Sequence, residues 1–313
     1  MSRVLTALLL LLFPLAALAE DTPRYVIYYN SEASPAEDLI GLPYSHVILS
    51  FVTLPAGGAQ GLSLVVAPRL DAPLKIVEKL QADGKKVLIS FGGGEMKLEA
   101  YRPAVGQEAA LAKLLAAFVA KHGLDGVDLD FEATGALRHP RQDGAFDGKA
   151  FLIALSRELR KTLPAGKLIT HAPQAPYLDP SWHKGPYLEI LQQAGADIDW
   201  ITVQYYNNPD FDLPVKSHLV GAERDPFPAS YTGIVGGAIG FTWPSEKTLV
   251  GLPVYAADAS NGHQPPKVVR DAILKPLVAR YGAKFGGLTG WQFSTLTADH
   301  RYWNEKLAGA LRE

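Results

Sequence analysis

Residues 124–132 read Leu-Asp-Gly-Val-Asp-Leu-Asp-Phe-Glu, with four acidic residues placed among apolar ones. Side chains of a β-strand alternate between its two faces, so Asp128, Asp130 and Glu132 share one face, with a spacing of about 7 Å. The apolar residues between them share the other face and can enter a hydrophobic layer. Neighbouring carboxylates repel one another, so a buried strand that carries three of them indicates catalysis. A calcium loop fits less well, because Leu129 and Phe131 interrupt the acids.

On both sides of this strand, short apolar runs alternate with helical patterns, which predicts an α/β fold. Eight strands separated by helices over this length are typical of a (β/α)8 TIM barrel. A doubly wound sheet is the competing arrangement, but no Gly-x-Gly-x-x-Gly follows the first strand. The predicted strands are Tyr25–Tyr29, His46–Phe51, Lys86–Phe91, Gly126–Phe131, Lys167–Ala172, Trp200–Tyr206, Thr248–Val254 and Leu288–Phe293. The predicted helices are Ala72–Ala82, Gln107–His122, Lys149–Thr162, Leu188–Ala194, Lys267–Tyr281 and Asn304–Leu311.

The longest connections follow the second, fourth and sixth predicted strands, at Val52–Asp71, Ala133–Gly148 and Asn207–Ser230. Long loops at the carboxyl ends of strands are where a barrel enzyme builds its active site. The sequence therefore predicts a catalytic centre at that end of the barrel.

Composition limits the kind of protein and its partners. The 313 residues include no cysteine, which excludes disulfides and thiolate metal sites, and no histidine spacing indicates a metal ion. A net charge of −2 argues against a nucleic-acid surface. Residues 1–19 resemble a secretory signal with an apolar run at Val4–Phe13, so we expect export to the periplasm or outside the cell. We expect residues 20–313 to form one catalytic domain, a monomer without a membrane anchor or cofactor.

Three further strand ends carry residues suited to a polar, neutral ligand. Ser90-Phe91-Gly92-Gly93-Gly94 closes the third strand, where glycine leaves room for close approach. In Gln204-Tyr205-Tyr206-Asn207 the alternation points Gln204 and Tyr206 into the barrel and Tyr205 outward. Trp291 on the last strand offers a flat apolar surface for a sugar ring, whereas Trp200 lies at a strand start and is predicted to be core.

Together these motifs resemble glycoside hydrolase family 18, the chitinase family. Asp125-x-x-Asp128-x-Asp130-x-Glu132 is similar to its fourth-strand signature, and Ser90-x-Gly92-Gly93 to its third-strand motif. Gln204-x-Tyr206-Asn207, Trp291 and Ala172-Pro173-Gln174 resemble the ends of its sixth, eighth and fifth strands. The likeness extends over nearly the whole chain and implies a (β/α)8 barrel that cleaves chitin or chitooligosaccharides.

The resemblance also implies roles for individual residues. Glu132 is expected to be the general acid and base of a retaining reaction in which the substrate's 2-acetamido oxygen is the nucleophile. Asp130 is expected to hold the acetamido N–H, to share a proton with Asp128, and, when ionised, to raise the pKa of Glu132. Tyr206 is expected to orient the acetamido group, and Trp291 to lie under the sugar. Ser90 and Tyr28 are expected to donate hydrogen bonds to Asp128, and Asp125 to give structural support. The expected substrate-binding positions are Gln204, Tyr28, Ser90, Gly92 and Asn207.

Two other activities remain open from the sequence. An endo-β-N-acetylglucosaminidase acting on N-glycans would use the same acids, and a chitinase-like lectin would typically lack the acid at position 132. One departure from many family members is visible, since Tyr255–Pro266 is too short for the small α+β domain that they insert after the seventh strand. We therefore predict an open groove and endo-type cleavage.

Overall fold

The structure is a computed structural model, and it describes residues 23–56, 61–142, 145–208, 227–293 and 297–313. The predicted signal at residues 1–19 lies outside the described residues, as does most of the predicted loop 207–230. Within the described ranges no single helix is long and apolar enough to cross a bilayer. The pair Leu98–Ala104 and Glu108–Lys121 meets that criterion only when combined across a bend of 98°.

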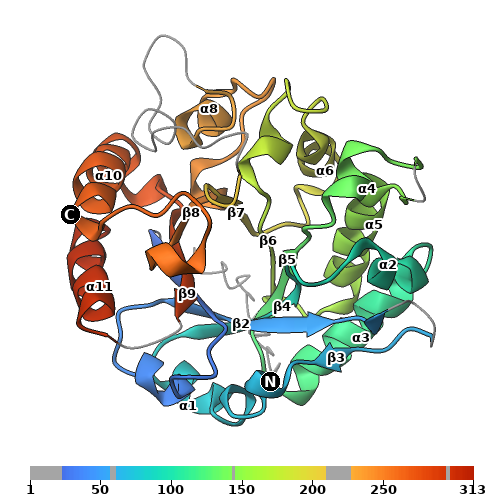
Figure 1. Cartoon of the computed structure of the whole chain (residues 1–313), viewed down its shortest axis with the longest axis horizontal. Helices are drawn as coiled ribbons and strands as arrows, with labels where there is room; N and C mark the ends of the chain where they lie inside the picture. Colours follow the sequence, from blue (N-terminus) through green and yellow to red (C-terminus); the bar gives the residue numbers. More distant parts are fainter. Residues whose placement is uncertain (1–22, 57–60, 143–144, 209–226, 294–296) are drawn as a thin grey trace, which may run out of the picture.

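Eight parallel strands close into a barrel, which confirms the predicted TIM fold (Figure 1). Each strand pairs with its neighbours in chain order, and the first pairs with both the second and the last. All eight predicted strands are present, with ends shifted by at most two residues. They are β1 (Arg24–Tyr29), β2 (His46–Thr53), β4 (Lys86–Gly92), β5 (Gly126–Asp130), β6 (Leu168–His171), β7 (Trp200–Gln204), β8 (Thr248–Pro253) and β9 (Gly287–Phe293).

The α-helices form a ring outside the barrel (Figure 1). The ring covers the apolar outer faces of the strands, which explains why runs such as Val47–Leu49 are continuously apolar. The helices are α1 (Val77–Ala82), α2 (Leu98–Tyr101), α3 (Glu108–Lys121), α4 (Thr134–Arg138), α5 (Gly148–Thr162), α6 (Pro186–Ala194), α8 (Tyr231–Gly236), α9 (Pro266–Val268), α10 (Lys275–Tyr281) and α11 (Ala298–Ala310).

Several elements differ from the sequence-based expectation. The predicted helix Ala72–Ala82 is α-helical only at Val77–Ala82, α11 begins at Ala298 and not at Asn304, and α2, α4 and α8 were not predicted. The predicted helix Lys267–Tyr281 is divided into α9, a π-helical segment at Val269–Leu274 and α10. Pro276 lies two residues after that segment and has no N–H to donate to a regular helix. The long loop after β2 also contains a short strand, β3 (Val65–Val66), which runs antiparallel to the end of β2.

A second, smaller core fills the barrel itself. Inward-facing side chains from several strands pack there around Trp200, which is fully buried as predicted. The guanidinium of Arg24 lies 4.7 Å from the ring of Trp200. This inner core, formed by Val26, Tyr28, Ile48, Leu88, Leu168, Ala172, Trp200 and Leu249, supports the polar residues at the carboxyl ends of the strands.

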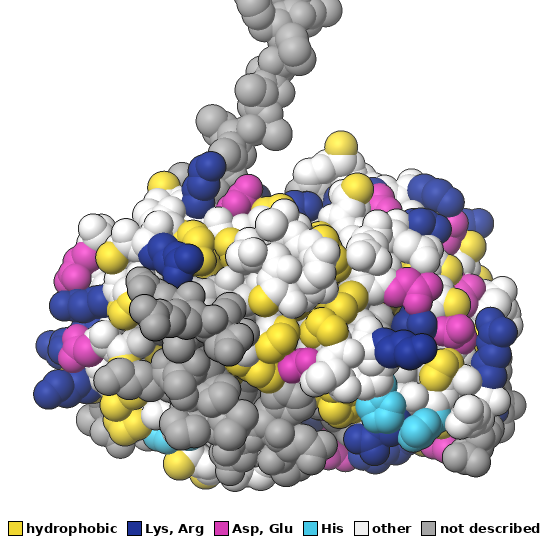
Figure 2. All heavy atoms as spheres, turned by 90° about the horizontal axis from the view of Figure 1, so that it is seen from above, with side chains coloured by type: hydrophobic (Ala, Val, Ile, Leu, Met, Phe, Trp, Pro, Cys, Tyr) yellow, Lys and Arg dark blue, Asp and Glu magenta, His cyan; other side chains and the backbone are white. Residues whose placement is uncertain are grey.

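The outer surface carries both signs of charge. Figure 2 shows Lys and Arg side chains interspersed with Asp and Glu on one side of the molecule. An interspersed pattern does not provide the one-signed field that nucleic acids require.

Candidate active site

The acidic row lies at the carboxyl end of β5, at the centre of the barrel mouth. Asp128 and Asp130 are inside the strand and are only 1% and 4% exposed. Glu132 lies two residues beyond Asp130, after the strand has ended, and is partly exposed. The predicted alternation agrees with the contacts of these groups, because Asp130 is hydrogen-bonded to Glu132 and lies close enough to Asp128 for the two charges to interact.

Three hydroxyl groups hold Asp128, two from the adjacent strands β4 and β6 and one from β1. Tyr28 Oη and Ser90 Oγ donate to its Oδ2 at 2.8 and 2.7 Å, and Thr170 Oγ1 donates to Oδ1 at 2.6 Å. Donors of this kind stabilise the ionised carboxylate, but burial opposes ionisation more strongly and raises the pKa of Asp128 to about 6. The predicted hydrogen bonds from Ser90 and Tyr28 are present, and the sequence analysis missed the one from Thr170.

Asp130 and Glu132 share a hydrogen bond and each also accepts one from a glutamine amide. Gln204 Nε2 donates to Asp130 Oδ1 at 2.9 Å, and Gln174 Nε2 donates to Glu132 Oε2 at 3.2 Å. Burial raises the pKa of both carboxyl groups, and the Asp130 pKa rises further because Glu132 and Asp128 are close to it.

The predicted cause of the raised Glu132 pKa is wrong. We expected the charge of Asp130 to raise it, but the dominant cause is burial. The hydrogen bond with Asp130 lowers the pKa of Glu132 and raises that of Asp130, so the two groups titrate as a linked pair.

The glycines after β4 allow the strands to approach at this point. Gly92 has a φ of +117°, and a Cβ atom there would lie 2.2 Å from the backbone oxygen of Asp130. The N–H of Gly93 donates to that same oxygen at 2.8 Å. A larger residue at position 92 would displace the strand that carries the acids.

A cavity of about 420 Å³ opens above the acids. Its lining includes Trp291, whose Nε1 donates to the backbone oxygen of Asp258 at 3.1 Å. The indole ring is 5.6 Å from the ring of Tyr28 and 5.9 Å from that of Phe51. The cavity is lined by Asn30, Phe51, Thr53, Val65, Ala67, Arg69, Gly92, Gly94, Glu95, Asp130, Glu132, Tyr206, Asn207, Asp258 and Trp291.

Among the residues predicted to contact a ligand, Gly92, Tyr206, Asn207 and Trp291 line this cavity together with Asp130 and Glu132. Asn207 Oδ1 also accepts the N–H of Ser260 at 2.7 Å, which ties its loop to the one after β8.

Three residues predicted as substrate-binding lie behind the two aspartates instead. Tyr28 and Ser90 donate to Asp128, and Gln204 donates to Asp130 and to the backbone oxygen of Ala172. None of these three is among the residues that line the cavity. These three residues hold the carboxyl groups in place from the side of the inner core, which fills the barrel behind the mouth.

Asp125 points away from the cavity, as its opposite parity predicts. Its Oδ2 accepts the backbone N–H of Val87 at 2.8 Å and the side-chain amide of Gln81 at 2.8 Å. It therefore connects the start of β5 to β4 and α1.

The cavity wall also contains residues that the sequence analysis missed. Phe51 and Arg69 come from β2 and the loop beyond β3, and Asp258 comes from the short segment after β8. Only the length of the Val52–Asp71 loop gave an indication of this part of the wall. No sequence motif surrounds Asp258, so nothing in the sequence indicated that it lines the cavity.

In the described ranges no three His, Cys, Asp or Glu side chains are grouped as ligands for a metal ion. His171 was predicted to be an ordinary polar residue. It is fully buried between Ser156 Oγ and Tyr187 Oη, at 3.0 and 2.7 Å, and burial lowers its pKa to about 3.

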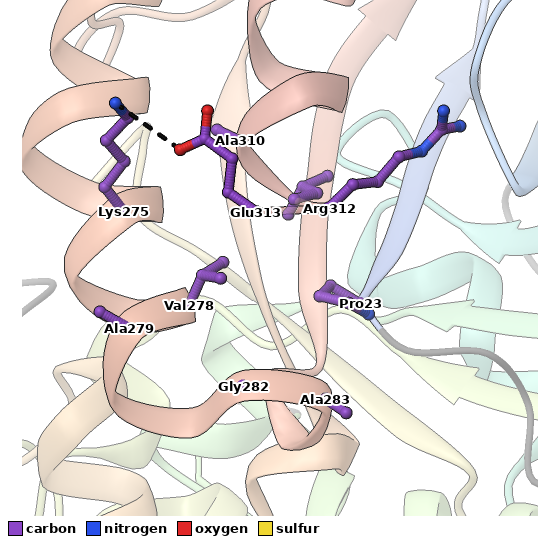
Figure 3. A pocket seen from close by; sticks show the side chains of 10 residues that line it. Pro23, Lys275, Val278, Ala279, Gly282, Ala283, Ala310, Arg312 and Glu313 are labelled. Atoms are coloured by element: carbon purple, nitrogen blue, oxygen red, sulfur yellow. Dashed lines mark ion pairs between the residues drawn. The ribbon is translucent and has the colours of Figure 1, made fainter.

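A larger cavity, of about 950 Å³, lies elsewhere in the molecule (Figure 3). It is bordered by α10, the end of α11 and Pro23 just before β1, which places it toward the opposite end of the barrel from the acids. Its charged groups include Lys275 and Glu313, which form an ion pair at 3.6 Å. Its lining includes none of the acidic cluster, so we assign the site to the smaller cavity.

Comparisons with known proteins agree with this geometry. The sequence model of "Glycosyl hydrolases family 18" matches residues 24–306. Chitinase ChiA of Flavobacterium johnsoniae is 26% identical over 236 residues, which cover 68% of this chain and 14% of that protein. The basic endochitinase of Nicotiana tabacum is 26% identical over 232 residues, which cover 69% of this chain and 65% of that protein. The match thus spans less than two thirds of either relative.

Among solved structures, a family 18 chitinase from Pseudoalteromonas aurantia has a similar fold, with a TM-score of 0.75. It is 33% identical in sequence, and the match covers 92% of this chain and 100% of that one.

Proposed function

This chain belongs to glycosyl hydrolase family 18 and is a glycosidase, and from that premise we propose that it is an endo-chitinase that cleaves β-1,4-linked N-acetylglucosamine chains. The observation that carries the proposal is the acidic row at the end of β5, of which Asp130 and Glu132 line a cavity together with Trp291. A flat indole suits the apolar face of a sugar ring, and the acids beside it supply proton transfer.

The spacing of the two outer carboxyl groups favours a nucleophile supplied by the substrate. Retaining enzymes with a protein nucleophile hold their carboxyl groups about 5–5.5 Å apart, on the two sides of the bond. Asp130 and Glu132 instead lie two residues apart on one chain segment and interact with each other, so they are not placed on the two sides of a bond. The substrate's 2-acetamido oxygen would attack the anomeric carbon instead, and an intramolecular nucleophile of this kind can lower the barrier by about 7–11 kcal/mol.

In this scheme Glu132 protonates the departing glycosidic oxygen and later removes a proton from the attacking water. Asp130 accepts the acetamido N–H, and the proton that it shares with Glu132 then passes to Glu132. Asp128, held by its three hydroxyl donors, takes part in the same coupled titration. Tyr206 lines the cavity beside Asp130 and orients the acetamido group.

The short segment after β8 supports cleavage within chains. Only residues 254–265 separate β8 from α9, so nothing of domain size rises on that side of the mouth. A long chain can therefore enter the groove sideways. We also propose that the protein acts outside the cytoplasm, on the basis of the signal-like residues 1–19.

The first test is Glu132→Gln, which keeps the size of the side chain and removes its acid. We expect hydrolysis of chitooligosaccharides to fall by at least about a hundredfold, as removal of a general acid implies, while binding by calorimetry persists. Glu305→Gln on the exposed face of α11 is the matched control and should retain full activity. Unchanged hydrolysis by Glu132→Gln would remove Glu132 from this role.

The substrate class is tested by product mass analysis with two substrates side by side. Chitooligosaccharides should be cut at internal bonds, and a high-mannose glycoprotein should be left intact. Release of the glycan, or strict removal of dimers from one chain end, would contradict the endo-chitinase proposal. A fully deacetylated oligomer should resist cleavage, because it lacks the acetamido nucleophile.

A further inference from the structure

Two glutamine amides from neighbouring strands hold the two outer carboxyl groups, one each. Gln204 ends β7 and donates to Asp130, whereas Gln174 follows β6 and donates to Glu132 at 3.2 Å. Gln174 and Gln204 are bridged in parallel register, and the N–H of Gln204 donates to the backbone oxygen of Pro173 at 2.9 Å. The backbone therefore fixes both amides with respect to each other and to the acids.

Gln174 donates its hydrogen bond to one particular oxygen of Glu132. Glu132 has left the ladder of β5, so its side chain lacks the strand packing that fixes Asp128 and Asp130. Gln174 Nε2 engages Oε2. Holding Oε2 limits rotation of the carboxyl group, and the contact therefore helps to determine the direction in which the other oxygen, Oε1, points.

We infer that Gln174 is a positioning residue for the general acid, which holds Glu132 Oε2 so that Oε1 faces the glycosidic oxygen. This inference rests on the proposed function of Glu132. Gln174 touches neither substrate nor reacting atoms in this role, because it is not among the residues that line the cavity.

The hydrogen bond from Gln174 also lowers the pKa of Glu132. An amide N–H that donates to a carboxylate favours its ionised form, and Gln174 is the strongest influence that lowers the pKa of Glu132 against the effect of burial. Loss of this donor should keep Glu132 protonated to higher pH. The other titratable groups that interact with Glu132 are Glu95, Lys97, Tyr101, Asp130, Tyr177 and Tyr206. Asp130 also interacts with Asp128, Tyr28 and Tyr187.

The test is Gln174→Met, which keeps an unbranched side chain of similar length and removes the amide. We expect the alkaline limb of the kcat/KM profile on a chitooligosaccharide to move up by about one pH unit, as the loss of one hydrogen bond to a charged group implies. We expect kcat at the optimum to fall about tenfold with little change in KM, because Glu132 is less well oriented. Gln193→Leu, an exposed amide on α6, is the control and should leave the profile unchanged.

Gln174→Asn keeps the amide but is one methylene shorter, and it should shift the profile in the same direction. The same pH profile is measured on Gln174→Asn if Gln174→Met does not fold. A folded Gln174→Met protein with the wild-type profile and kcat would overturn the inference while leaving the role of Glu132 intact. If Glu132→Gln remains active, the proposed function itself fails.

Discussion

Replacing Asp128 by Asn should stabilise the folded protein at neutral pH, although the residue lies in the catalytic cluster. Burial raises the pKa of Asp128 from 3.8 to about 6 in the folded state. Between these values the unfolded chain releases a proton that the folded protein retains, so the free energy of unfolding falls as pH rises through this window. At 1.36 kcal/mol per pH unit, the loss is about 3 kcal/mol once the pH exceeds 6.

Asparagine removes this loss and can keep the hydrogen bonds. Its Oδ1 still accepts from Thr170, and its Nδ2 can donate to the hydroxyl oxygens of Ser90 and Tyr28 after those hydroxyls rotate. The gain over wild type should therefore be near zero at pH 4 and approach about 3 kcal/mol at pH 7. Hydrolysis should fall about tenfold or more, because the coupled titration of the cluster is disturbed.

The assay is urea unfolding followed by tryptophan fluorescence at pH 4.5 and pH 7.5, with activity measured on the same samples. Asp71→Asn, on the surface, is the control for the loss of one acidic side chain. The reasoning fails if the stability difference between Asp128→Asn and wild type is the same at both pH values. It also fails if the variant is less stable at pH 7.5 than at pH 4.5 relative to wild type.

Two further substitutions test how the strands around the acids are held. Gly92→Ala places a Cβ 2.2 Å from the Asp130 oxygen at a φ of +117° and should lower the free energy of unfolding by about 2–5 kcal/mol. Gly84→Ala, at a φ of +84° in open space, should lose only about 1 kcal/mol, and equal losses in urea unfolding would disprove the collision. Asp125→Ala leaves the N–H of Val87 without its acceptor and should lower the free energy of unfolding by about 1–3 kcal/mol, with kcat unchanged. A large fall in kcat would assign Asp125 to the reaction.

The barrel could be predicted from the sequence because the patterns that indicate its strands lie within short stretches of the chain. Each parallel strand is buried on both faces, so runs such as Val87–Ile89 are continuously apolar, and the alternation of acids on β5 fixes which side chains point inward. The short β3 was missed because Val65 and Val66 pair only with the end of β2, and two residues carry no periodic pattern.

The parts of the site that were missed depend on contacts between distant segments. Gln174 reaches Glu132 because a backbone bridge sets the spacing of two loops, and nothing in the local sequence specifies that bridge. The bonds from Tyr28 and Ser90 to Asp128 were predicted, but Gln204 was expected to contact the ligand and bonds Asp130 instead. Parity indicates the face of a strand but not the depth at which a side chain meets the cavity.

The inner core beneath the acids also determines how the active site exchanges protons with water. Below Asp128 the barrel is filled by side chains such as Leu88 and Trp200, and Arg24 lies against the far side of that indole. In the described part of the barrel, protons therefore enter and leave the carboxyl cluster from the mouth. A polysaccharide lying across the mouth would seal the cluster from buffer, so each turnover would recover its proton from the single water molecule that completes hydrolysis.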